Sequence, residues 1–136
     1  MDLTAILEPI MFLKLACLAF LAILFLQSGL DKVFDYAGNL DWLQGHFANS
    51  PLKGSVKLML PAITVLEVAA GALSAAGFVM LLIQGNTQVG MLGAQLSALS
   101  ILCLFFGQRL AKEYVGASVL AGYFVVCLVS IYVLSL

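Results

Sequence analysis

The chain has 136 residues, the length of one domain, and 63% of them are hydrophobic whereas only 10% are charged. Soluble proteins have roughly 45–50% apolar and about 25% charged residues, and small domains bury the smallest fraction of their surface. A soluble globular domain is therefore excluded. The net charge of −1 also excludes a charge-rich disordered chain and a basic surface for nucleic acid. The chain is predicted to lie in lipid.

Four apolar segments are predicted to cross the membrane. The first contains Lys14 as its single charged residue, and the long apolar stretch 58–108 contains only Glu67. Because roughly 20 residues cross the hydrocarbon core, that stretch must hold two spans, separated by the polar turn Gln84–Gln88. The predicted spans are residues 9–30, 58–83, 89–108 and 114–136.

The connections between these spans predict their arrangement. Residues 84–88 and 109–113 are short connections, which make consecutive helices antiparallel neighbours. Helices are expected because no segment shows the alternation of apolar and polar residues that a barrel strand needs. We therefore expect an all-α membrane protein with four transmembrane helices in an up-down-up-down antiparallel bundle.

The first connection, residues 31–57, is much longer and holds six of the thirteen charged residues. Loops beyond about 12–15 residues are usually functional or disordered, and the aromatic residues here argue against disorder. Leu40, Leu43 and Phe47 recur at a helical spacing. This pattern predicts a short amphipathic helix at the membrane surface, ended by Pro51.

The basic residues predict the orientation in the membrane. Five of the six flank the connections 31–57 and 109–113, and only Lys14 belongs to the opposite face. Because Lys and Arg are enriched in cytoplasmic loops, both connections are expected in the cytoplasm and both termini outside it. The first span has no basic residue before it and no Ala-x-Ala site at its end, so we expect it to be retained and not cleaved as a signal.

The chain offers few ligands for a metal or cofactor. A single histidine cannot supply both axial ligands of a haem, and no cluster provides the roughly four ligands of a zinc site. The three cysteines lie on different spans without a C-x-x-C motif, and no glycine pattern typical of nucleotide binding occurs. We expect no metal, and no cofactor bound by this chain alone.

Glu67 is the one acidic residue near the middle of a predicted span, roughly 14 Å from the span's start at 1.5 Å per residue. An unpaired carboxylate there costs on the order of 3 kcal/mol. Its side chain must therefore face inward and either keep its proton or find a partner among Lys32, Gln27 and Gln95. Two interpretations stay open: a hydrogen-bonded link between helices, or a proton-handling or ligand-orienting group.

Polar and aromatic residues near the first connection form a second candidate site. Trp42 is interpreted either as an interfacial anchor or as part of a ligand pocket. His46, whose ordinary pKa lies near neutrality, is either a solvated loop residue or a proton-exchanging group at the mouth of a quinone pocket. Gln27 and Gln95 are candidates for the lining of the same pocket.

Two short patterns occur in this part of the chain: Ser-Gly-Leu-Asp-Lys at residues 28–32, and Pro61, Glu67 and Gly71 in the second span. They resemble the G-x-x-K signature and the proline, glutamate and glycine pattern of the DoxX family of small membrane proteins. The resemblance covers all four spans. The matching residues are Gly29, Lys32, Pro61, Glu67 and Gly71.

This resemblance implies a four-helix bundle in the bacterial inner membrane with a link to redox chemistry. DoxX relatives include a subunit of a thiosulfate:quinone oxidoreductase and members of thiol-stress membrane complexes. It also implies pairing of Lys32 with Glu67, but it supplies no cofactor ligand. A quinone is the ligand that it suggests.

Two functions follow as hypotheses. The first is a small membrane subunit of a quinone-linked or thiol-oxidising redox complex, not catalytic by itself. The second is a non-catalytic scaffold that anchors a larger membrane or secretion assembly. Both predict membrane lipid and other complex subunits as partners, and stripes of small residues such as Gly90, Ala94 and Ala98 would also suit a homo-oligomer.

Overall fold

The computed structural model describes all 136 residues and is entirely helical. Four of its helices are long and apolar enough to span a membrane, which indicates a multi-pass membrane protein. The helices are α1 (Leu3–Ile6), α2 (Pro9–Phe34), α3 (Tyr36–His46), α4 (Val56–Gln84), α5 (Gln88–Leu110) and α6 (Tyr114–Leu134). The four long ones are α2, α4, α5 and α6.

The ends of the helices follow from local sequence. The Glu8 carboxylate accepts hydrogen bonds from the backbone N–H groups of Ile10 and Met11, and Pro9 occupies the first helical position of α2. At the C-terminal end of α4, Gly85 has φ +69°. This left-handed conformation, which glycine adopts without strain, ends α4 and starts the turn to α5.

The structure shortens the long first connection. Helix α2 continues past the expected end of its span to Phe34, and α4 begins at Val56. Between them lies α3, on which Leu40 and Leu43 are half-buried, and Phe47, just after its end, is buried. The intervening Asp41 and Gln44 are exposed. Pro51 does not end this helix, so that prediction is wrong. The α-helix ends at His46 because the backbone hydrogen bonds change there from the α-helical i to i−4 pattern to i to i−3, as in the bond from the Ala48 N–H to the Gly45 carbonyl.

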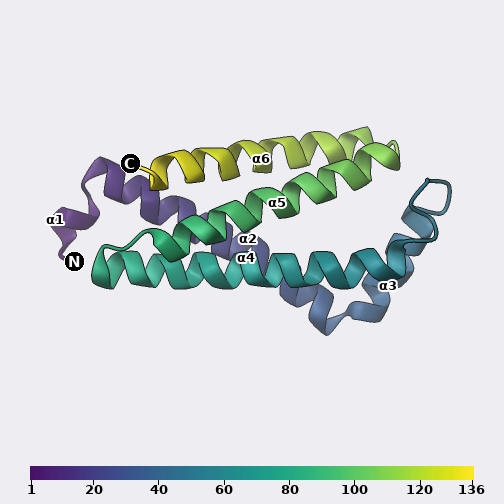
Figure 1. The fold of residues 1–136 in the computed structure, drawn as a ribbon, viewed down its shortest axis with the longest axis horizontal. Helices are drawn as coiled ribbons and strands as arrows, with labels where there is room; N and C mark the ends of the chain where they lie inside the picture. Colours follow the sequence, from purple (N-terminus) through teal and green to yellow (C-terminus); the bar gives the residue numbers. More distant parts are fainter.

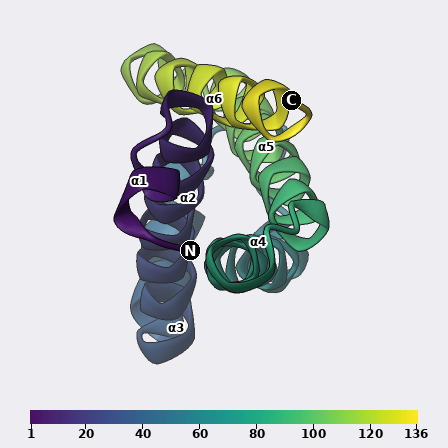
Figure 2. The same ribbon diagram turned by 90° about the vertical axis from the view of Figure 1, so that its left-hand side faces the viewer.

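The four long helices surround a common axis. Helix α4 packs along both α2 and α5, while α6 packs on α5 and also contacts α2, which closes the ring seen end-on in Figure 2. Both termini lie at one end of the molecule, and α3 lies towards the other end (Figure 1). Residues 47–55 and 111–113 lie at that same far end.

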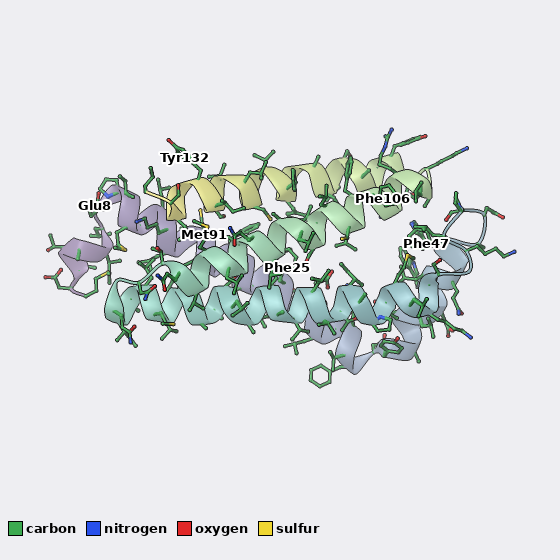
Figure 3. The ribbon with its side chains drawn as sticks, viewed as in Figure 1. Glu8, Phe25, Phe47, Met91, Phe106 and Tyr132 are labelled. Atoms are coloured by element: carbon green, nitrogen blue, oxygen red, sulfur yellow. The ribbon has the colours of Figure 1, made fainter.

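Small residues allow this close packing. A Cβ atom on Gly71 of α4 would lie 2.6 Å from the Leu26 backbone nitrogen, and one on Gly93 of α5 would lie 2.6 Å from the Ser74 nitrogen. Van der Waals contact between such closely approaching backbones is a main source of helix association in lipid. Phe25, only 2% exposed, fills the middle of the bundle, whereas Tyr132 projects from its outer surface (Figure 3).

Candidate functional site

A cavity of about 620 Å³ lies at the α3 end of the bundle, bordered by the end of α2 and by α3, α4, α5 and α6. Most of the side chains around it are apolar, and they extend from α3 towards the middle of the long helices. Its apolar residues include Leu60, Ile63, Leu66, Leu104 and Leu120. Its polar and aromatic residues include Lys32, Asn39, Trp42, His46 and Gln108.

His46 connects α3 to α5 at this cavity. Its Nε2 atom lies 2.7 Å from Oε1 of Gln108. Because an amide oxygen only accepts hydrogen bonds, Nε2 is the donor in this arrangement, which leaves Nδ1 of a neutral ring free as an acceptor. The imidazole also stacks on Trp42, with centroids 4.7 Å apart and an interplanar angle of 14°, and it is perpendicular to the Phe47 ring, with centroids 4.9 Å apart. The ring is therefore held in one orientation at the cavity wall.

Ser28, Lys32 and Glu67 form a buried triad beside the cavity. The Glu67 side chain is 1% exposed, and its Oε2 atom lies 3.0 Å from Lys32 Nζ. The Ser28 hydroxyl donates to the same carboxylate oxygen at 2.7 Å and accepts from Lys32 Nζ at 3.0 Å. Ser28 and Lys32 are four residues apart on α2, so both face Glu67 on α4. The carboxylate thus has two partners within the bundle.

The structure places Gln27 and Gln95 elsewhere. Both side chains are exposed on the outside of their helices, and neither lines the cavity or bonds to Glu67. Of the three candidate partners of Glu67, the structure therefore brings only Lys32 to the carboxylate, and it does not place the two glutamines at this cavity. The reason is rotation about the helix axis: Gln27 precedes Ser28 by one residue, which is about 100° on a helix with 3.6 residues per turn.

Four of the five residues of the DoxX-like pattern lie at the contact between α2 and α4. Lys32 and Glu67 form the ion pair, and a Cβ on Gly29 would lie 2.9 Å from the Val68 nitrogen. Gly71 meets α2 in the same way. Pro61 is the exception, because it is an exposed residue inside α4.

Sequence reasoning missed several residues of this region. Ser28 could have been found from its i, i+4 spacing to Lys32, and Gln108 as the last polar residue of its span. Asn39 and the exposed thiol of Cys103 also line the cavity, whereas Cys127 is buried.

No group of three or more His, Cys, Asp or Glu side chains is arranged to hold a metal ion. Comparison with protein-family models, curated proteins and solved structures finds no match to this chain.

Proposed function

We propose that this chain is a small, DoxX-like membrane subunit of a redox complex, and that its cavity binds a quinone. The observation that carries the proposal is the cavity of about 620 Å³ beside the fixed His46 ring. Ligand pockets are usually about 300–1,000 Å³ in volume, mostly apolar, with a few convergent polar groups. A quinone matches these features, because its tail is apolar and its flat ring carries two carbonyl acceptors.

The polar and aromatic residues at the α3 end of the cavity support a quinone as its ligand. The aromatic pair of Trp42 and His46 offers a flat surface for a ring, and Gln108 and Asn39 offer amide groups beside it. The apolar side chains of α4 and α6 offer a path for the tail. This chain's own residues would bind and orient the quinone, and a partner subunit would supply the electrons.

We also propose that the four long helices cross the bacterial inner membrane in alternate directions, with the cavity in the cytoplasmic leaflet. Support comes from the position of the basic residues. Lys57 is in the first turn of α4, Arg109 is in the last turn of α5, and Lys53 and Lys112 lie in the connections next to them. This end of the bundle is opposite both termini (Figure 1). Arg109 lies over the Tyr114 ring, 4.7 Å from its centroid. Such an amphipathic aromatic is typical of the membrane interface.

A scaffold function is the second candidate, and a specific observation favours it. Gln27 and Gln95 are exposed on the outside of segments that are otherwise suited to lipid. An amide facing hydrocarbon is costly unless a neighbouring helix provides a hydrogen-bond partner. Copurification from native membranes separates the two functions. Redox subunits and quinone are expected with the first, and a secretion or envelope assembly with the second.

Trp42 provides the direct test, because it is the only tryptophan and lines the cavity. In purified protein, a short-tailed ubiquinone analogue should quench its fluorescence saturably. The variant Ala62→Phe places a ring in the cavity and should abolish saturable quenching. Val65→Phe is the matched control, because residue 65 is on the same helix but outside the cavity. Equal quenching in both variants would refute quinone binding in this cavity.

A further inference from the structure

Lys32 belongs both to the buried triad and to the cavity wall. Its ammonium group donates to Ser28 Oγ and Glu67 Oε2, each at 3.0 Å. The side chain nevertheless remains 15% exposed, and Lys32 is one of the residues that line the cavity. An ammonium group has three N–H donors. Two are used within the triad, and the third is available to an acceptor in the cavity.

The charge around this donor determines which acceptor suits it. Lys32 is the only Lys, Arg, Asp or Glu among the lining residues, and its charge is balanced by Glu67. An anionic head group would therefore bring an uncompensated charge into a mostly apolar cavity, which is unfavourable. An uncharged carbonyl oxygen accepts a charge-assisted hydrogen bond from Lys32 without that cost.

We propose that Lys32 is a ligand-binding residue that donates to an uncharged carbonyl oxygen, and that Glu67, which balances the Lys32 charge, gives the cavity its preference for uncharged over anionic head groups. The proposal deepens the quinone function above and rests on it for the choice of a quinone. Its chemistry is shared by any apolar molecule with an uncharged carbonyl, such as a lipid ester. Glu67 acts here as a positioning residue, because it reaches the ligand only through Lys32.

Three probes test this proposal by native mass spectrometry of the purified full chain. They are a short-tailed ubiquinone analogue, monoolein and oleate. The last two share the 18-carbon oleoyl group, which is esterified to glycerol in monoolein and ends in a free carboxylate in oleate. For the wild-type protein, the quinone and monoolein should bind at least about tenfold more tightly than oleate. Tighter binding of oleate would overturn the proposed preference.

Glu67→Gln is the sharpest variant, because it leaves Lys32 in place with an unbalanced charge. The ratio of oleate to monoolein affinity should then rise about tenfold or more. A merely structural carboxylate would lower both affinities and leave their ratio unchanged, which would refute the role of Glu67. The matched control is Lys57→Met, an exposed lysine at the start of α4 that is outside the cavity. It should leave every affinity unchanged.

The double variant Lys32→Met with Glu67→Gln removes both charges together and avoids a lone buried charge. Its affinity for quinone and monoolein should fall about tenfold. Unchanged affinities would refute the role of Lys32 and leave the quinone function standing. Binding of monoolein but not of quinone, with the expected dependence on Lys32, would refute the quinone function instead. If the double variant fails to fold, the affinity ratio of Glu67→Gln decides the question alone.

Discussion

Gly77 of α4 and Gly90 of α5 meet so closely that a Cβ on Gly77 would lie 2.3 Å from the Gly90 Cα. Real Cβ atoms essentially never come within 3.0 Å of such a neighbour. The contact is between two backbones, so no flexible side chain can move aside. It therefore fixes how α4 and α5 pack next to the turn that joins them.

Gly77→Ala is expected to destabilise the bundle, because α5 must shift to admit the methyl group. The cost should be about 1–3 kcal/mol, the usual range for overpacking. Thermal unfolding in detergent, followed by circular dichroism, measures it. Gly122→Ala is the control: residue 122 is also in a helix, but its added Cβ would meet nothing within 4 Å. Equal stability of the two variants would contradict the packing argument.

The ion pair of Lys32 and Glu67 gives a second prediction. Lys32→Met should destabilise the folded protein by about 3–5 kcal/mol, because it leaves the Glu67 carboxylate buried without its charged partner. Glu67→Gln should cost less, since the Lys32 side chain is 15% exposed and the charge left unpaired is therefore less completely buried. The double variant should be more stable than the sum of the two single losses implies. Unfolding of all four proteins in the same detergent completes this double-mutant cycle, and additive losses would exclude a coupled pair.

Ser28 gives a third prediction, separate from the charge pair. Ser28→Ala removes the hydroxyl that donates to Glu67 and accepts from Lys32. A hydrogen bond to a charged group contributes roughly 1.5–3 kcal/mol, so a loss of that size is expected. Ser118→Ala is a suitable control because that hydroxyl is exposed and bonds only within its own helix. If both variants lower the unfolding temperature equally, the hydrogen bonds of Ser28 to Glu67 and Lys32 do not contribute the expected stability.

The apolar spans and the inward position of Glu67 could be predicted because both follow from the cost of polar groups in lipid. An apolar run longer than one membrane thickness must turn, and a mid-span carboxylate must find a partner. These arguments concern depth along the membrane normal. Depth alone left three candidates for the partner of Glu67.

Rotation about the helix axes could not be predicted in the same way. Gln27 and Ser28 are adjacent in sequence, yet only Ser28 faces Glu67. With apolar residues on every side of α2, the hydrophobic pattern does not identify the buried face. The rotation of α2 about its axis is determined by close contacts such as that of Gly29 with Val68 of α4. Such a contact involves residues of both helices, so the sequence of α2 alone does not reveal it. A pocket near Trp42 and His46 could be suggested from the sequence, but its wall on α5 could not, because Gln108 is 62 residues away from His46 in the chain.

The hydrogen bond between His46 and Gln108 gives a fourth prediction. His46→Phe keeps an aromatic ring but loses the bond, and Gln108→Leu removes the acceptor. A typical hydrogen bond contributes about 0.5–1.5 kcal/mol, so amide exchange in α3 should quicken by up to about tenfold in either variant. Combining the changes should add little, because both remove the same bond. Hydrogen–deuterium exchange measures this, with Gln27→Ala as control, and unchanged α3 protection would show that the bond does not hold α3.

The last prediction concerns the orientation proposed from the basic residues. With Cys17, Cys103 and Cys127 replaced, a reporter cysteine is placed at Gly54, where an added Cβ would meet nothing within 4 Å. Gly38 is a poorer position, since its Cβ would lie 2.6 Å from an Asp35 carboxylate oxygen. In intact cells the Gly54→Cys reporter should resist an impermeant maleimide, because positive residues favour the cytoplasmic side. Asn86→Cys, in the turn at the opposite end, should be labelled. The reverse pattern would place the cavity in the outer leaflet, and labelling of both or neither would contradict a membrane crossing by α4, which lies between the two reporters.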